Sequence, residues 1–437
     1  MLKSRFGPRT AEALVSLLLL CALTVTEAAA VPKVYIDITK EAGRKITIAA
    51  APLAARESAA EKNLRSVLER DLVLTGYLSL LPMESLQQEL FLEETESGKV
   101  NFPSWLSWGA ELLLRTTYEE RRGSILLTGK LYDVERGTLL LGREYRGGEG
   151  QGAKAVHSLV NDIVKELTGQ EGIALSRVAL AWANDGPKRI SIMDYDGRGL
   201  QPVSPEGVLS LYPAWFPDGQ RLAYVTYRFG RTEIVVHDLR SGRIRSVAFF
   251  PGMNAFPSLS PDGKQMLLTL SRDGNPEIYR MAVDSSSLKR LTFSKAVEAS
   301  PAWSPDQRQM AFISDRSGSP QIYVSKTSGG RARRVSYTGH YSTSPDWSPK
   351  DGQIVFTSMT DGTFQLFLVD LDTGENVQLT TGAGNKEDPS WAPDGIHVMY
   401  SVGRGSTYQL SVLDSRTGET FPLPRARGSL TSPDWSP

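Results

Sequence analysis

The sequence predicts two folded parts in series, a mixed α/β domain and then an all-β region made of six copies of one four-stranded unit. Three observations predict this fold class. One seven-residue motif recurs every 44 residues through the second half of the chain. Residues 31–172 combine alternating strand patterns with two amphipathic helices. The 437 residues also include 39 glycines and 25 prolines, which without a collagen period is typical of an all-β chain with many turns.

The repeated motif is Pro-x-Trp-Ser-Pro-Asp-Gly, with small variations between copies. Its leading prolines stand 44 residues apart, at Pro213, Pro257, Pro301, Pro345, Pro389 and Pro433. The second proline presets its own φ, the aspartate can bond the local backbone, and the glycine accepts a positive φ, so the motif predicts a tight hairpin. Apolar runs with the same period supply the other strands. Four antiparallel strands, A to D, in about 40–45 residues are typical of one blade of a β-propeller.

Two incomplete units predict how the ring of blades closes. Residues 178–182 and 190–193 have the pattern of strands B and C, and no strand A precedes them. Residues 433–435 have the pattern of a strand A, and no strand B follows. The fragments complete one another, so we expect a six-bladed propeller over residues 173–437 that is closed by the C-terminal strand. Closure of this kind removes free sheet edges.

Tryptophan occupies the same place in five of the six copies, at Trp215, Trp303, Trp347, Trp391 and Trp435. These side chains could pack between neighbouring blades or form an aromatic ligand site. Their recurrence around the whole ring favours packing.

Residues 31–172 predict a small α/β domain. Strand patterns cover residues 34–38, 45–49, 77–81, 110–117, 124–134 and 138–145. Ser58 and Glu61 form a capping box at the start of one amphipathic helix. A second helix is expected over residues 153–167, with Gly169 as its C-terminal cap.

Residues 1–30 have the pattern of a cleaved secretory signal peptide. Lys3, Arg5 and Arg9 precede an apolar stretch over residues 13–23, and residues 28–30 are alanines. A retained N-terminal anchor is the alternative. The one cysteine, Cys21, would leave with the signal peptide, so the mature chain would hold no thiol nucleophile or thiolate ligand. No other apolar run is long enough to span a bilayer, so we expect a soluble exported protein, most simply a periplasmic one.

The residues of this chain predict no catalytic centre, metal site or cofactor. The four histidines form no HExxH motif, and no Gly-x-Ser-x-Gly motif occurs. Residues 148–152 are glycine-rich but lack a following Gly-Lys-Ser/Thr, which favours a flexible loop over a phosphate site. Residues 194–197 resemble the start of a calcium loop but fit a hairpin turn better, and His157 is expected at the surface. The balance of 49 basic and 49 acidic residues argues against nucleic-acid binding.

An exported α/β domain followed by six Pro-x-Trp-Ser-Pro-Asp-Gly blades resembles the TolB family of the Tol–Pal envelope system. The resemblance covers the whole predicted mature chain. It implies a non-enzymatic periplasmic adaptor that binds the lipoprotein Pal through the propeller and TolA through its N-terminal segment. It further implies a role in outer-membrane integrity and cell division. An exported propeller enzyme, or a propeller that binds a small molecule at its central channel, stays open as an alternative.

The resemblance also implies where partners bind. Residues 31–38 match the family's N-terminal switch segment, and we expect Val34, Tyr35, Ile36 and Asp37 to contact a partner, unless they form an ordinary first strand of the α/β domain. Pal is expected on the propeller face where the loops from strand D to the next strand A converge. The candidate residues in these loops are Met253, Asn254, Phe256, Glu298, Ala299, Tyr341, Thr343, Lys386 and Glu387.

Overall fold

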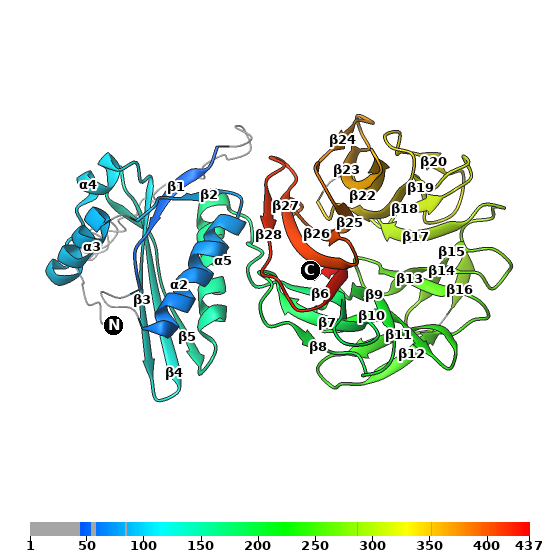
Figure 1. The fold of residues 1–437 in the computed structure, drawn as a ribbon, viewed down its shortest axis with the longest axis horizontal. Coiled ribbons are helices and arrows are strands. Elements are labelled where there is room, and N and C mark those ends of the chain that lie inside the picture. The colour runs from blue at the N-terminus through cyan, green and yellow to red at the C-terminus, as the bar shows by residue number, and fades with distance from the viewer. Residues whose placement is uncertain (1–43, 54–57, 84, 286, 351) are drawn as a thin grey trace, which may run out of the picture. The chain divides into compact units, whose positions relative to one another are not determined.

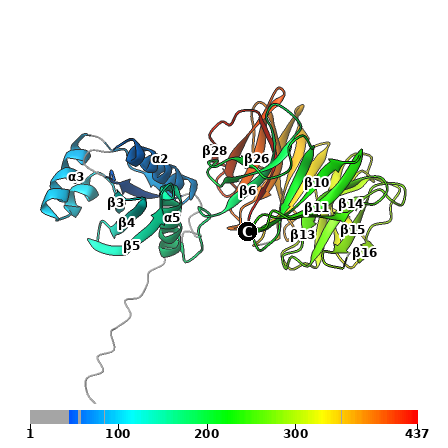
Figure 2. The ribbon, with the colours of Figure 1, turned by 90° about the horizontal axis from the view of Figure 1, so that it is seen from below.

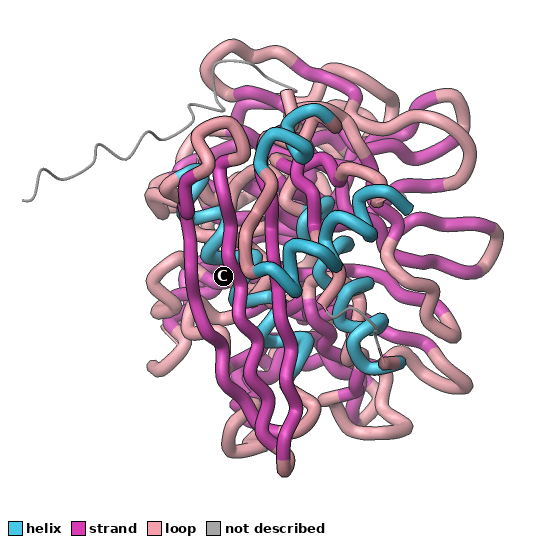
Figure 3. The backbone as a smooth tube through the Cα atoms, turned by 90° about the vertical axis from the view of Figure 1, so that its left-hand side faces the viewer, coloured by secondary structure: helices cyan, strands magenta, loops and turns pink. Residues whose placement is uncertain are grey.

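The α/β domain is built on a five-stranded sheet of strand order β2-β1-β3-β4-β5 (Figure 1). β1 runs parallel to β2 and β3, and β3, β4 and β5 form an antiparallel meander whose long strands lie side by side (Figure 3). The strands are β1 (Ile46–Ala50), β2 (Leu78–Leu80), β3 (Leu112–Arg121), β4 (Ser124–Asp133) and β5 (Thr138–Gly148).

The computed structural model describes residues 44–53, 58–83, 85–285, 287–350 and 352–437. The predicted signal peptide of residues 1–30 and the predicted switch segment of residues 31–38, with Val34, Tyr35, Ile36 and Asp37, lie outside the described residues.

Helices cover both faces of the sheet. They are α2 (Ala59–Leu74), α3 (Ser85–Ser97), α4 (Phe102–Ser107) and α5 (Gly152–Thr168). α2 begins with the predicted capping box of Ser58 and Glu61, and α5 ends at Gly169, whose φ of 73° is left-handed. Ile48 and Leu114 pack in one buried cluster with α2 and α5, whereas Ala49 and Leu113 point the other way, into a cluster that includes Trp105 of α4. The sequence analysis does not predict α3 or α4.

Six four-stranded sheets form the propeller, as predicted (Figure 2). In order from inner to outer strand, blade one is β29 (Ser429–Trp435), β6 (Arg177–Ala183), β7 (Arg189–Asp194) and β8 (Gln201–Pro202), and blade two is β9 (Ser210–Trp215), β10 (Arg221–Arg228), β11 (Arg231–Asp238) and β12 (Ile244–Ala248). Blade three is β13 (Asn254–Leu259), β14 (Gln265–Leu270), β15 (Glu277–Ala282) and β16 (Leu288–Arg290), and blade four is β17 (Glu298–Trp303), β18 (Gln309–Ser314), β19 (Gln321–Lys326) and β20 (Arg333–Arg334). Blade five is β21 (Ser342–Trp347), β22 (Gln353–Thr360), β23 (Thr363–Asp370) and β24 (Asn376–Gln378), and blade six is β25 (Asn385–Trp391), β26 (His397–Arg404), β27 (Thr407–Asp414) and β28 (Thr420–Pro422).

The C-terminal strand closes the ring, as predicted. β29 pairs antiparallel with β6, with Thr431 opposite Ala181 and Trp435 opposite Val178. Blade one is therefore assembled from chain segments that lie about 250 residues apart in the sequence. The hydrogen bond from Thr431 Oγ1 to the carbonyl oxygen of Ala181 joins them.

The hairpins between strands A and B have the predicted chemistry. Asp218 Oδ1 accepts a hydrogen bond from the backbone N–H of Gln220 at 2.8 Å, and Gly219 has a φ of 63°. A second feature also repeats in every copy. The residue before each leading proline has a positive φ of 48–53° and lies at a bulge in the inner strand, at Tyr212, Phe256, Ser300, Ser344, Asp388 and Ser432.

The repeated tryptophans pack between blades. Trp215 of blade two lies in one buried cluster with Ala179, Ile190 and Ile192 of blade one. The indole N–H groups also donate across the blade boundary, from Trp215 to the carbonyl of Asp434 at 3.1 Å, from Trp303 to Ser258 at 3.0 Å, and from Trp391 to Asp346 at 3.2 Å. The prediction of a packing role is confirmed.

The inner strands surround a channel of about 460 Å³ whose lining aspartates come from blades five, six and one. The residue before the tryptophan is Asp346, Ser390 or Asp434 in blades five, six and one, and each side chain accepts a hydrogen bond from the backbone N–H of the next blade's tryptophan at 2.6–3.0 Å. Ala214, Ser258 and Ala302 hold this position in blades two, three and four. Burial raises the pKa of Asp346 to about 6 and that of Asp434 to about 8, and the charge of Asp346 adds to the rise at Asp434.

The apolar core of the α/β domain continues into the propeller. Leu167 of α5, Val178 of β6 and Met399 of β26 belong to one buried cluster. The Arg70 side chain also donates to the carbonyl oxygen of Pro422 at 2.8 Å. The residues that the structure describes accordingly belong to one compact unit.

A chain that ends at residue 428 should lose the cooperative fold of the propeller. Removal of β29 leaves β6 without its inner partner and deletes the Trp435 side chain, so we expect a loss of more than about 4 kcal/mol in the free energy of unfolding. Urea unfolding followed by near-ultraviolet circular dichroism measures it. Removal of Pro437 alone, outside the strand, is the control and should leave the transition unchanged. A truncated chain with the original transition would contradict closure by β29.

Asp434→Asn should stabilise the fold increasingly as the pH rises. The carboxyl group has a pKa of about 8 in the folded chain and about 3.9 when unfolded, so unfolding releases a proton between these values and stability falls as pH rises through them. Asparagine keeps a side-chain oxygen that accepts the hydrogen bond from the Trp215 backbone N–H, but it has no carboxyl proton to lose. The urea midpoint of the variant minus that of the original chain should therefore grow from pH 5 to pH 8.

Ser390→Ala is the matched control, because this hydroxyl has the same place in the repeat and does not titrate in this range. It should lower the urea midpoint by an amount that is constant with pH. A constant difference for Asp434→Asn as well would show that its carboxyl group is not protonated in the folded chain.

Candidate functional site

The loops from strand D to the next strand A lie at the same end of each blade as the turns from strand B to strand C. Backbone hydrogen bonds join the two, for example from Tyr227 N–H to the Leu209 carbonyl and from Met359 N–H to the Tyr341 carbonyl, both at 2.9 Å. We call this end of the propeller the loop face.

Exposed apolar side chains recur on the loop face at two positions of the repeat. Four residues before the leading proline lie Leu209, Met253, Val297 and Tyr341, each 36–43% exposed. Eight residues before it lie Phe249, Phe293 and Tyr337, exposed by 38–77%. Phe229, in the turn between β10 and β11, is 84% exposed. We call these eight residues the apolar arc; it covers blades two to five.

The other blades are polar at the same positions. Asn385 and Ser429 stand four residues before their prolines, and Thr381 and Arg425 stand eight residues before. The loop face is therefore chemically asymmetric although its backbone repeats. Monomeric proteins rarely expose several large apolar groups on one face without an interaction there.

Arginine side chains accompany the exposed rings of the arc. The guanidinium carbon of Arg231 lies 3.7 Å from the ring centroid of Phe249, that of Arg290 lies 4.8 Å from Phe293, and that of Arg334 lies 5.3 Å from Tyr337. Cation–π contacts of this kind orient the rings and add positive charge to the face. A partner that presents apolar groups bordered by carboxylates would match it.

Asn254, Glu298 and Lys386 of the predicted contact set are buried in the structure. They share one repeat position, three residues before the leading proline, and the structure buries all three side chains. The amide of Asn254 donates to three backbone carbonyls, and Lys386 Nζ donates to three carbonyls of its own loop at 2.8–2.9 Å. Glu298 pairs with Arg316. Buried groups with these partners shape the loops of the propeller.

The remaining candidates are placed in three ways. Met253 and Tyr341 are exposed and belong to the apolar arc. Ala299, Thr343 and Glu387 share the next repeat position and are half-buried, and Glu387 accepts a hydrogen bond from Tyr408 at 2.7 Å. Phe256 lies at the bulge, lines the channel and packs on Tyr212 with ring centroids 4.4 Å apart.

Six members of the arc are absent from the predicted set: Leu209, Phe229, Phe249, Phe293, Val297 and Tyr337. Alignment of the six copies could have found most of these residues. Residues at the same position of the repeat have similar burial, so the alignment separates the exposed positions of the arc from the buried position of Asn254, Glu298 and Lys386.

His157 is buried, whereas the sequence predicts a surface position. Only 4% of its side chain is exposed, and its Nδ1 lies 2.6 Å from Oδ2 of Asp71 on α2. The polar stripe of α5 that carries His157 is covered by polar groups of α2 and of the turn after β7, a pairing that no local pattern reveals. Burial alone would lower the pKa of His157, but the hydrogen bond and charge of Asp71 raise it, and burial raises the pKa of Asp71.

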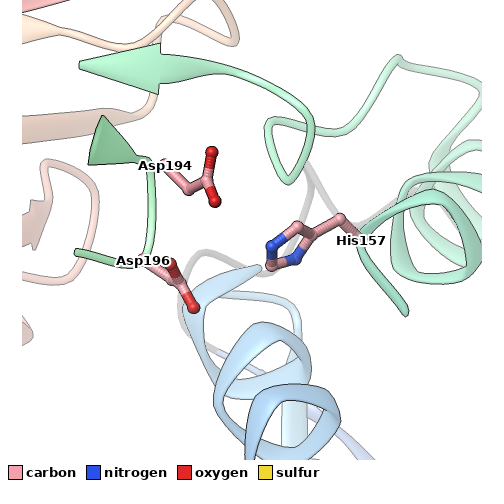
Figure 4. Close-up of side chains that lie close together, drawn as sticks. All are labelled: His157, Asp194 and Asp196. Atoms are coloured by element: carbon pink, nitrogen blue, oxygen red, sulfur yellow. The ribbon is translucent and has the colours of Figure 1, made fainter. Parts of the chain in front are cut away.

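Residues 194–197 form the predicted hairpin turn between β7 and β8. Its two carboxylates and the His157 ring point toward one another (Figure 4). One ligand atom from each of His157, Asp194 and Asp196 lies within 4.8 Å of the others, and in the part of the chain that the structure describes this is the group with the geometry to hold a metal ion.

No helix among the described residues is both long and apolar enough to cross a bilayer.

Comparison with known proteins agrees with the fold and the repeat. A family model described as the TolB beta propeller domain matches residues 164–437, and one described as the TolB amino-terminal domain matches residues 34–140. The crystal structure of TolB from Acinetobacter baumannii is similar to this chain with a TM-score of 0.78 at 27% identity, covering 90% of this chain and 97% of that one.

Curated relatives carry the same family name. The Tol-Pal system protein TolB of Syntrophus aciditrophicus is 35% identical over 240 residues, which is 53% of each protein. That of Nitrosococcus oceani is 31% identical over 228 residues, 50% of this chain and 51% of the relative. The match thus spans about half the length of these curated relatives. Their names describe a component of the Tol-Pal system. The chain belongs to the TolB family of Tol-Pal system proteins.

Proposed function

We propose that this chain is a periplasmic adaptor of the Tol–Pal system that binds the lipoprotein Pal through the loop face of its propeller. The apolar arc is the observation that carries the proposal. Its eight side chains lie on the face implied by the family resemblance and give blades two to five an apolar surface that blades six and one lack. Aromatic and methionine side chains of this kind dominate the energetics of protein interfaces.

The proposal includes the N-terminal segment. Residues 1–30 would direct export and be removed, residues 31–172 would form the α/β domain, and residues 173–437 the propeller. Residues 31–38, with Val34, Tyr35, Ile36 and Asp37, would bind TolA as an added strand or short extended peptide. Together the two contacts would support outer-membrane integrity and cell division.

The central channel supports a second candidate less well. Its volume of about 460 Å³ is in the range of a small-molecule site. However, its polar groups Asp346, Ser390 and Asp434 are already engaged by backbone N–H groups of neighbouring blades. These hydrogen bonds between neighbouring blades explain why polar side chains stand in the channel, and they do not require a ligand.

Loss of arc side chains should weaken binding to the soluble domain of Pal from the same organism. We expect Phe293→Ala and Tyr337→Ala each to raise the dissociation constant by about tenfold or more, and Val297→Ala by about three- to fivefold, because each removes exposed apolar area from the interface. Isothermal titration calorimetry measures these changes.

Val377→Ala is the matched control for Val297→Ala. The two valines are 42% and 43% exposed, but Val377 lies on the outer strand β24, away from the loop face. It should change the dissociation constant by less than about twofold. Equal effects of the two valine substitutions on the dissociation constant, or no effect of Phe293→Ala and Tyr337→Ala, would show that Pal does not bind at the apolar arc.

Removal of residues 31–38 from a chain that begins at residue 31 should alter the affinity for Pal and abolish binding to TolA. The same titration, with each partner in turn, tests both expectations. Retained TolA binding would contradict the role of this segment. Absence of Pal binding by either form would contradict the adaptor function itself.

A further inference from the structure

His157, Asp194 and Asp196 come together from two parts of the fold. His157 lies on α5 of the α/β domain, Asp194 ends β7 of blade one, and Asp196 lies in the turn that follows (Figure 4). His157 and Asp196 are buried, whereas Asp194 is half-buried and leaves a route to solvent. A ligand atom from each residue lies within 4.8 Å of the other two.

The hydrogen bonds of His157 leave one ring nitrogen without a partner. Nδ1 lies 2.6 Å from Asp71 Oδ2, so in the neutral ring the proton is on Nδ1 and Nε2 carries the lone pair. Nε2 is buried and has no hydrogen-bond partner. A lone pair beside two carboxylates is unfavourable unless a proton or a metal cation lies among them, and a metal ion competes with the proton for Nε2.

Asp71 has the position of an outer partner of a metal-binding histidine. Histidine ligands usually donate their second N–H to a carboxylate, which fixes the ring and makes the ligating nitrogen more basic. Asp71 is fully buried on α2 and holds the ring in this way. The ring also packs edge-on against Tyr195, with centroids 5.6 Å apart, so its orientation is held from two sides.

Asp196 is oriented as well. Its Oδ1 accepts a hydrogen bond from the backbone N–H of Arg198 at 3.0 Å, while its Oδ2 lies 3.1 Å from Arg198 Nε without a hydrogen bond to any group. The Arg198 guanidinium also donates to Asn63 at 3.1 Å. Because the positive charge of Arg198 partly neutralises Asp196, we expect a metal ion to bind these residues with micromolar rather than tighter affinity.

We propose that His157, Asp194 and Asp196 form a site for a divalent transition-metal ion, in the first place Zn²⁺. One imidazole and two carboxylates are a ligand set for zinc, whereas calcium and magnesium prefer oxygen ligands alone. Tetrahedral zinc with bonds near 2.0–2.1 Å needs ligand atoms about 3.3 Å apart, so small inward rotations of the three side chains suffice. Water would supply the fourth ligand from the side of Asp194. The ion would join α5 to blade one.

The test is equilibrium dialysis of the tag-free full chain against Zn²⁺, with the bound metal measured by plasma mass spectrometry. We expect one Zn²⁺ per chain and a rise of several degrees in Tm that EDTA reverses. His157→Gln and Asp194→Asn should each lower the affinity by about 100-fold or more, and Asp71→Asn by about 10–100-fold as the outer partner. If His157→Gln does not fold, Asp194→Asn tests the metal site by itself, because Asp194 is only half-buried.

His237→Gln is the matched control. His237 is also a buried histidine with an unpartnered ring nitrogen, but it is not part of the three-residue group, so this variant should bind Zn²⁺ as the original chain does. The proposal is overturned by no zinc binding below millimolar concentration, or by binding that His157→Gln and Asp194→Asn leave unchanged. Preference for Ca²⁺ over Zn²⁺ would overturn the assignment to a transition metal.

Discussion

Contacts between neighbouring inner strands are the constraint on which the rest of the propeller depends. A single blade has an apolar face that it cannot bury alone. Trp215, Trp303 and Trp391 each lie against the preceding blade, and their indole N–H groups donate to a carbonyl there. The last such contact joins Trp215 to Asp434, so the series closes on itself. This explains why the motif is nearly invariant in the inner strands and turns, where every copy must meet the same geometry.

Differences between the copies carry the specific chemistry. The repeat fixes which positions are buried and which are exposed, and the residue type at each position then varies from blade to blade. In the channel, Asp346, Ser390 and Asp434 share a repeat position with Ala214, Ser258 and Ala302. On the loop face, Phe293 and Tyr337 correspond to Thr381 and Arg425. A symmetrical backbone thus presents an asymmetrical surface, which a single partner can recognise in one orientation.

Much of the fold could be predicted because its signals are local or periodic. The 44-residue spacing predicts six blades and their closure, and the capping box of Ser58 and Glu61 predicts the start of α2. α3 and α4 were not predicted, since α3 is polar over much of its length and α4 spans six residues. The site was predicted less well. Burial of His157 depends on Asp71 and Tyr195, which are distant in the sequence, and burial of Asn254 depends on Thr232 and on neighbouring loop carbonyls.

The pairing of β29 with β6 also dictates an order of events in folding. Blades two to six consist of consecutive segments and can form locally, whereas blade one waits for residues 429–435. Until then β6 presents an unpaired edge and the channel is open between blades six and two. Such long-range pairing is slow, and unpaired edges promote aggregation. The interval before closure is therefore the period in which this chain is most exposed to edge-to-edge association, through the edge of β6.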